Sequence, residues 1–238
     1  MVVKAVVFVL DETIADFNLD QMTMKAEVRS HLVKEGIPAS VLLTNESMFD
    51  MLKKAEIFLK NSGKSDRSVV KTRKEVWSLA QQHELEAAKT ASLVPGIVEV
   101  LEALKKMQLK LGLVTTKGEK TANYILKRFG LSKFFNSVTP REKVKSVNPS
   151  YKHLESAIKA LHVKPEEAML ITKDDQDISC GRELNVLVIG LTKGLSSEKE
   201  FTAAGVNYLI SSILEVPRLV ETINKSQRSK RVRNRKTP

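Results

Sequence analysis

Cysteine is almost missing from this sequence, and so are long apolar runs. The single Cys180 among 238 residues excludes an internal disulfide framework and indicates a reducing compartment, so we predict a cytoplasmic protein. Its place in a helical pattern with Ile178 and Leu184 indicates a packing residue rather than a nucleophile. No stretch approaches the ~20 apolar residues that cross a membrane, and residues 1–10 lack the basic start of a signal peptide. We therefore expect no membrane association.

Histidine is scarce as well. The four histidines are scattered over predicted helices without the spacing typical of metal ligands, so the sequence assigns them no role. They are His31, His83, His153 and His162.

Acidic residues are missing from the last 14 residues, KSQRSKRVRNRKTP, which carry seven of the cations behind a net charge of +11. Removing these seven charges leaves +4 for the rest of the chain. The seven cations are Lys225, Arg228, Lys230, Arg231, Arg233, Arg235 and Lys236. After Ser226 the segment has almost no apolar content, so we predict that residues 226–238 are disordered on their own. Such a tail either keeps the chain soluble or binds RNA or another polyanion, and its lack of aromatic residues argues against base-specific stacking.

Short apolar strands alternate with amphipathic helices from about Leu93 onward. A Pro95-Gly96 step starts the first of these helices, and Gly130 ends the second. The expected strands cover residues 3–9, 109–115, 137–139, 168–172, 186–191 and 208–210. Apolar strands joined by helices are typical of a parallel sheet with helices on both faces, so we predict an α/β, Rossmann-like core.

The segment between residues 15 and 92 has a different pattern. Its apolar residues recur at helical spacing, as in Met24, Val28 and Leu32, and no strand pattern interrupts them. Thr44 and Asn45 are candidate caps for a second helix. We therefore predict a core domain from residues 1–14 and 93–225, interrupted by an all-helical domain at residues 15–92.

Polar residues follow four of the expected strands, at the edge where open parallel sheets place their chemistry. These segments read VLDET at 9–13, TTK at 115–117, SVNPS at 146–150 and TKDDQD at 172–177. Together they resemble the four motifs of the haloacid dehalogenase superfamily, and the resemblance covers about residues 1–224. The helical insertion and the PG-x-x-x-x-L-x-x-L-K segment at Pro95–Lys105 also agree, as do TKG at 192–194 and AGVNYLI at 204–210. The arrangement is similar to the phosphoglycolate-phosphatase-like branch, whose helical insertion is a cap domain.

The first motif departs from the family pattern D-x-D-x-T. The resemblance implies that its first aspartate attacks phosphorus and that its second acts as general acid and base. Asp11 occupies the second position, but Val9 occupies the first, and an isopropyl group has no lone pair to attack with. Glu12 stands where the family usually has glycine.

The second motif keeps the family's residues. The resemblance implies that the Thr115 hydroxyl hydrogen-bonds phosphoryl oxygens. Thr116 and Lys117, close to a helix start, are expected to add contacts to the same anion.

The third and fourth motifs are altered. Aligning the family's second proline with Pro149 puts Ser146 at the position of the motif-three lysine. In motif four, Lys173 replaces one of the aspartates that hold magnesium, while Asp177 persists as a candidate ligand. A one-residue shift would bring Asp174 into the site instead.

These substitutions change the charge of the predicted site. The family's carboxylates repel one another and are balanced by a divalent cation. Because Val9 removes one anionic group and Lys173 adds a cation, we expect no metal cofactor, with Mg²⁺ retained only if catalytic capacity remains. We expect the Lys173 ammonium to pair with Asp11 or Asp177.

Three hypotheses of function follow from these motifs. The first is a pseudophosphatase that keeps the fold and binds a phosphorylated small molecule or phosphate without hydrolysing it, since loss of a nucleophile removes most of a catalytic effect. The second is a hydrolase with an altered site, a Mg²⁺-dependent phosphomonoesterase. The third is an RNA or ribonucleoprotein adaptor that works through the basic tail.

Overall fold

The computed structural model describes residues 2–144, 147, 150–192 and 194–234. The chain divides into two compact units, Met1–Asp16 with Ser92–Pro238, and Phe17–Ala91. The helical insertion expected at residues 15–92 corresponds to the second unit, whereas the first unit extends to Pro238, beyond the core-domain end expected at residue 225. Ser146, Arg235 and Lys236 lie outside the described residues.

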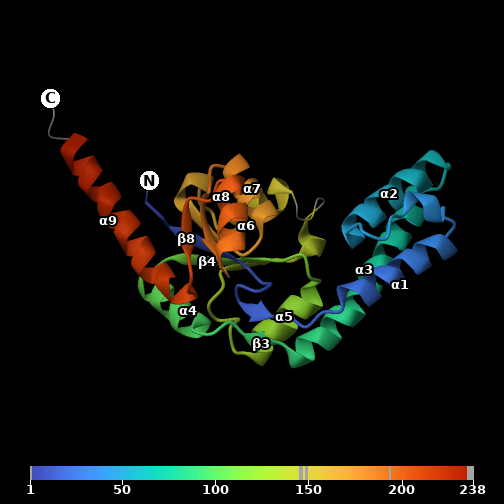
Figure 1. The fold of residues 1–238 in the computed structure, drawn as a ribbon, viewed down its shortest axis with the longest axis horizontal. Helices are drawn as coiled ribbons and strands as arrows, with labels where there is room; N and C mark the ends of the chain where they lie inside the picture. Colours follow the sequence, from blue (N-terminus) through green and yellow to red (C-terminus); the bar gives the residue numbers. More distant parts are fainter. Residues whose placement is uncertain (1, 145–146, 148–149, 193, 235–238) are drawn as a thin grey trace. The chain divides into compact units, whose positions relative to one another are not determined.

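A six-stranded parallel sheet forms the first unit, with the strand order β5-β4-β1-β6-β7-β8 (Figure 1). The strands are β1 (Ala5–Val9), β4 (Lys110–Val114), β5 (Ser137–Thr139), β6 (Ala168–Thr172), β7 (Leu187–Leu191) and β8 (Tyr208–Ile210). The chain builds outward from β1 to β5 on one side and from β6 to β8 on the other. The strand order therefore reverses beside β1, the central strand.

Helices cover both faces of this sheet, as predicted. They are α4 (Ile97–Lys106), α5 (Glu119–Arg128), α6 (Tyr151–Ala160), α7 (Asp175–Glu183), α8 (Leu195–Ala204) and α9 (Val216–Asn234). Alternate residues of β1 face opposite sides, because side chains alternate along a strand. Val7 lies in a cluster with Leu154 and Ile158 of α6. On the other side, the rings of Phe8 and Phe135 pack edge to face, with 6.5 Å between their centroids. The α/β fold class is confirmed.

Two short strands mark the two points where the chain leaves and re-enters the first unit. β2 (Ala15–Asp16) pairs antiparallel with β3 (Ser92–Leu93), with Asp16 opposite Ser92. This pair could not be predicted, because two residues are too few for a periodic pattern.

The second unit contains three α-helices among its described residues, α1 (Gln21–Lys34), α2 (Met48–Asn61) and α3 (Asp66–Thr90). The predicted stripe of Met24, Val28 and Leu32 is buried in this unit's own apolar cluster. The predicted caps of α2 are wrong: Ser47 is the N-cap, and its Oγ accepts a hydrogen bond of 3.1 Å from the amide of Asp50. Thr44 and Asn45 lie too far upstream for this bond, which joins the cap to the third helical residue.

Helix α9 extends through residues that we expected to be disordered. Its backbone is helical to Asn234, so the prediction of disorder is wrong for residues 226–234. Val220 and Ile223 anchor the start of α9 in the apolar interior, and Glu221 pairs with Lys225 one turn on. Extending a helix that already exists requires only one residue to be ordered per hydrogen bond, and residues 226–234 contain neither glycine nor proline. Among the described residues, no helix combines the length and apolar character that a membrane crossing requires.

Candidate functional site

The carboxyl ends of β4, β1 and β6 lie side by side at one edge of the sheet. Val9 is in register with Val114, and Phe8 is in register with Ile171. The residues that follow these strands therefore meet beside the point where the strand order reverses, which is where ligands bind in open α/β sheets. Three of the four predicted motifs begin at this edge.

Val9 ends the central strand without a polar group. Its side chain is partly buried and packs against the apolar cluster that contains Val7 and Leu154. In the turn that follows, the backbone of Glu12 has φ +56°. This value lies in the left-handed region, which residues other than glycine seldom adopt. The Val9 position therefore belongs to the apolar core of the first unit.

Asp11 is held by residues of the second motif. Lys117 Nζ lies 2.8 Å from Asp11 Oδ1, and Thr115 Oγ1 donates a long hydrogen bond of 3.4 Å to Asp11 Oδ2. The Lys117 side chain is 9% exposed and that of Asp11 is 30% exposed. The structure thus places an ammonium beside Asp11, but it comes from Lys117, a partner that the sequence did not suggest.

The Thr115–Lys117 loop is fixed by its own hydrogen bonds. The amide of Lys117 donates to Thr115 Oγ1 at 3.0 Å, and the amide of Thr115 donates to the carbonyl of Thr139 at 3.2 Å. The start of α5 is already occupied: the Glu119 amide donates to Glu142 Oε2 at 2.9 Å. The Glu119 amide is therefore not available to an anion near this loop.

The fourth motif arranges its two aspartates differently. Thr172 Oγ1 donates to Asp177 Oδ2 at 2.9 Å, and Asp177 is 6% exposed. Asp174 is exposed and caps α7, where its Oδ1 accepts hydrogen bonds from the amides of Gln176 and Asp177 at 2.8 and 3.2 Å. Asp177 is therefore the buried carboxylate of this motif. Lys173 lies half-buried between Thr172 and Asp174, and its pairing stays a prediction.

Arg141, in the segment that leads to the third motif, is a residue that sequence reasoning missed. Its side chain is fully buried, and Nη1 donates to the carbonyl of Thr116 at 3.2 Å. The Arg141 amide also donates to the carbonyl of Lys117, at 3.3 Å. Arg141 thus connects the third segment to the second motif. Its position soon after β5 was a usable signal, because the same strand-end rule identified the other motifs. Lys143 is instead half-exposed, and its Nζ donates to the carbonyl of Val138.

Two buried groups near the site carry no charge at neutral pH. Burial lowers the pKa of His153 to about 4, while its hydrogen bond with the carbonyl of Thr139 opposes that shift. Burial, with a smaller effect from Asp177, raises the pKa of the Cys180 thiol to about 11. A protonated thiol is a poor nucleophile, so Cys180 serves as a packing residue.

The residues at this edge do not fit the Mg²⁺ that the fold family implies. Mg²⁺ prefers near-octahedral oxygen ligands at about 2.0–2.1 Å. Val9 supplies no oxygen and Lys173 supplies a cation, which leaves Asp11 and Asp177 as the carboxylates at the acidic positions of the family pattern. Asp174, the alternative ligand, is exposed and caps α7. Asp11 Oδ1 already contacts an ammonium, and Asp177 Oδ2 already accepts from Thr172.

The fold and the position of the site define a class, the α/β proteins with a Rossmann-like core and an inserted helical unit. Residues 6–191 match the family model described as haloacid dehalogenase-like hydrolase. The chain belongs to this family, and the resemblance drawn from the four motifs is confirmed.

Curated relatives of the chain include pyrophosphatases. Pyrophosphatase PpaX of Halalkalibacterium halodurans is 30% identical over 118 residues, which cover 50% of this chain and 55% of that protein. Pyrophosphatase PpaX of Bacillus mycoides is 27% identical over 128 residues, 54% of this chain and 60% of that protein. The match therefore spans little more than half the length of these relatives.

Solved structures share the fold over most of the chain. A protein from Haemophilus somnus, described as a predicted phosphoglycolate phosphatase, is 17% identical with a TM-score of 0.59, and the match covers 91% of this chain and 97% of that one. A hydrolase from Pseudomonas syringae is 21% identical with a TM-score of 0.60, covering 92% and 98%. At these identities the likeness concerns the fold.

Proposed function

We propose that this member of the hydrolase family binds a phosphorylated small molecule, or phosphate itself, without hydrolysing it. One observation carries the proposal: the residue at the strand end where the nucleophile belongs is Val9, whose partly buried side chain packs against the apolar core. The covalent route of this fold starts with attack by a carboxylate oxygen at that position. A valine cannot begin that route, because it offers no lone pair.

The state of Asp11 supports the same proposal. As an acid and base it would exchange protons with the substrate, yet its carboxylate contacts the Lys117 ammonium at 2.8 Å and the Thr115 hydroxyl at 3.4 Å. With no nucleophile beside it, Asp11 instead orients Lys117 and Thr115.

Lys117 and Thr115 are the groups that we propose bind the anion. The Lys117 ammonium brings a positive charge and N–H donors to the strand ends, where it contacts Asp11 Oδ1. Charge-assisted hydrogen bonds to phosphate are among the stronger interactions of a binding site. Thr116 contributes through its backbone, which Arg141 holds in place from the interior.

Titration of the full chain with inorganic phosphate and with phosphoglycolate tests this site. We expect saturable binding that Lys117→Met weakens at least about tenfold, since a hydrogen bond to a charged group contributes about 1.5–3 kcal/mol. Lys143→Met is the matched control, because Lys143 is a half-exposed lysine of a neighbouring loop. Equal binding by both variants, or no binding by the unaltered chain, would refute the proposed site.

A second candidate is an active hydrolase with an altered site. The observation in its favour is that the similar proteins from Halalkalibacterium and Bacillus are pyrophosphatases. Such an enzyme would need an alternative carboxylate, with Asp11 or Glu12 at the strand end. It would release phosphate from pyrophosphate or a phosphomonoester with Mg²⁺, and the release would depend on Asp11.

A third candidate concerns the basic segment rather than the strand ends. Its supporting observation is that the backbone of residues 226–234 continues α9, which spaces the cations of this segment along a helix. Truncation after Lys225 removes six of the seven tail cations. If the segment binds RNA, truncation should reduce the affinity and flatten its dependence on salt. Unchanged binding at two salt concentrations would exclude the tail.

A further inference from the structure

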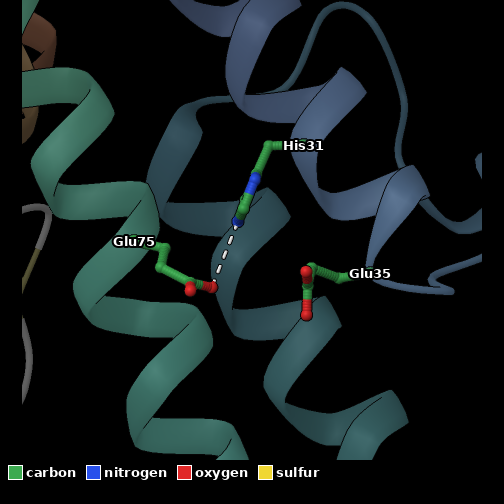
Figure 2. Close-up of side chains that lie close together, drawn as sticks. All are labelled: His31, Glu35 and Glu75. Carbon is green, nitrogen blue, oxygen red and sulfur yellow. Dashed lines mark ion pairs between the residues drawn. The ribbon is translucent and has the colours of Figure 1, made fainter.

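We propose that the helical unit contains a binding site for a transition-metal dication, with Zn²⁺ as its natural occupant, formed by His31, Glu35 and Glu75. His31 lies on the last turn of α1, Glu35 is the residue that ends this helix, and Glu75 lies on α3. One ligand atom from each residue can be chosen so that all three lie within 4.8 Å of one another. Figure 2 shows the His31 ring pointing at the Glu75 carboxylate, with the Glu35 carboxylate beside them.

Helix geometry explains why these residues meet. His31 and Glu35 are four residues apart, so their side chains emerge on the same face of α1, one turn apart. That face packs against α3, because Val28 and Leu32 on α1 share a buried cluster with Val76 and Ala80 on α3. The site therefore lies wholly within the second unit, at the edge of its apolar core.

The distances suit a tetrahedral ion. His31 Nε2 lies 3.4 Å from Glu75 Oε2. A metal bonded to nitrogen and oxygen at about 2.0–2.2 Å in tetrahedral geometry separates two ligand atoms by about 3.3–3.5 Å. The His31–Glu75 pair thus already has the spacing of two ligands on one ion, and a rotation of the exposed Glu35 side chain supplies the third.

A second observation concerns the hydrogen bonding of the same two atoms. His31 Nε2 and Glu75 Oε2 are buried atoms that face each other at 3.4 Å, and neither makes a hydrogen bond among the described residues. Buried polar atoms of this kind are rare in folded proteins and call for an explanation. An ion between the imidazole nitrogen and the carboxylate oxygen satisfies both atoms at once. Lys71 Nζ lies 3.5 Å from the other carboxylate oxygen, Glu75 Oε1, and leaves Oε2 available.

The ligand chemistry selects the class of metal. Imidazole nitrogen suits zinc and its neighbours in the first transition row, whereas Mg²⁺ and Ca²⁺ prefer oxygen ligands throughout. One histidine and two glutamates make three protein ligands, which leaves a fourth position for water or an exogenous group. This inference is independent of the proposed function, because it uses no residue of the strand-end site.

Titration of the full chain with Zn²⁺ alone, followed by calorimetry, tests the site. We expect one bound ion per chain, and at least about tenfold weaker binding in His31→Gln and in Glu75→Gln. His83→Gln is the matched control: His83 Nε2 lies 2.9 Å from Glu27 Oε2 in the same unit, and the pair belongs to no such cluster. The control should bind Zn²⁺ as the unaltered chain does.

Co²⁺ absorption gives a second readout on the unaltered chain, so the test does not depend on how well the variants fold. Visible bands of a four-coordinate ion should appear at one equivalent, persist in Asp11→Asn and disappear on adding excess Zn²⁺. If the chain binds no Zn²⁺ and shows no Co²⁺ bands, His31 and Glu75 form an ordinary ion pair, and the inference is overturned. Zn²⁺ binding that is lost in Asp11→Asn but kept in His31→Gln would overturn it as well.

Discussion

At the scale of single residues, Val9 and Lys173 decide the charge at the strand ends. Both positions are expected to carry carboxylates in the family, and here they supply an apolar side chain and a cation. Because catalytic groups act as a unit, the loss of a nucleophile removes most of the rate enhancement that the remaining groups support. Lys117 beside Asp11 then balances one of the remaining carboxylates from within the chain.

Restoring both carboxylates should restore some chemistry. We expect the double variant Val9→Asp with Lys173→Asp to release phosphate from a phosphomonoester in the presence of Mg²⁺. The expected rate is at least about tenfold above that of the unaltered chain, a difference of about 1.4 kcal/mol in the barrier. Adding Asp11→Asn to the double variant is the control and should abolish the gain. No gain at all would show that the neighbourhood of Val9 has been repacked beyond the reach of these two changes.

His153 makes the stability of the first unit depend on pH. Burial lowers the pKa of His153 from 6.5 to about 4 in the folded chain. Between these two pH values, the unfolded chain binds a proton at His153 and the folded chain does not. The stability present above pH 6.5 is therefore lost as the pH falls toward 4. We expect the free energy of unfolding to decrease by about 2 kcal/mol between pH 7 and pH 5 on account of this group.

Urea denaturation at the two pH values measures this effect, with His153→Gln as the control. Glutamine keeps a side-chain donor for the carbonyl of Thr139 and does not titrate in this range. A variant that loses as much stability as the unaltered chain over the same interval would contradict the assignment to His153.

At the scale of helices and strands, the connections from helix to strand share one backbone feature. After each of α4 to α8 the chain passes through a residue in the left-handed region. These residues are Gln108 (φ +58°), Gly130 (φ +67°), His162 (φ +52°), Asn185 (φ +57°) and Gly205 (φ +84°). Amides beyond the helix then turn back to its last carbonyls, as when Leu109 donates to Leu104.

Glycine suits these positions better than a residue with a Cβ. We expect Gln108→Gly to stabilise the chain by about 0.5–1 kcal/mol and Gly130→Ala to destabilise it by about 1 kcal/mol. A Cβ at Gly130 would have no heavy atom within 4 Å, so the cost reports the backbone alone. Chemical denaturation of both variants checks the pair. Shifts of the same sign in both would contradict the account.

The sequence predicts some elements to the residue. Ser137–Thr139, Ala168–Thr172 and Tyr208–Ile210 are strands where the apolar runs placed them, because polar or turn residues bound each run. The bounds of α3, Asp66–Thr90, could not be predicted, since its later turns carry alanines and a buried Glu84 in place of large apolar residues. Burial of Glu84 depends on neighbours that are distant in the sequence.

Prediction of the candidate site is limited in the same way. The four strand ends could be predicted, because topology alone brings them to one edge of the sheet. The pairing of Lys117 with Asp11 could not, since it joins residues 106 positions apart. The same holds for the contact of Arg141 with Thr116, and for His31 with Glu75, whose histidine had no role in the sequence.

At the scale of the whole molecule, the chain contains two units that each have an apolar cluster of their own. The two connections between them leave the first unit side by side, because Asp16 pairs with Ser92 in the antiparallel β2–β3 ladder. The second unit is therefore inserted between two residues of the first unit, Asp16 and Ser92, that are paired neighbours in space.

Removing the insertion tests this organisation. Replacing Phe17–Ala91 with Asn-Gly joins the paired strands by a two-residue hairpin turn, whose left-handed conformation these residues favour. We expect the shortened chain to unfold in one cooperative transition and to retain the secondary structure of the core, as measured by circular dichroism during denaturation. A compact but non-cooperative state that binds a hydrophobic dye would show that the core depends on the insertion.

Phosphate release from pyrophosphate and from phosphoglycolate, measured with Mg²⁺ for the unaltered chain beside Asp11→Asn, tests the central claim most directly. Asp11→Asn removes the carboxylate at the position where the family pattern has its acid–base group, and so reports any contaminating enzyme. The account predicts that the two preparations release phosphate at the same background rate. Release by the unaltered chain that exceeds background and disappears in Asp11→Asn would contradict it and establish an active hydrolase.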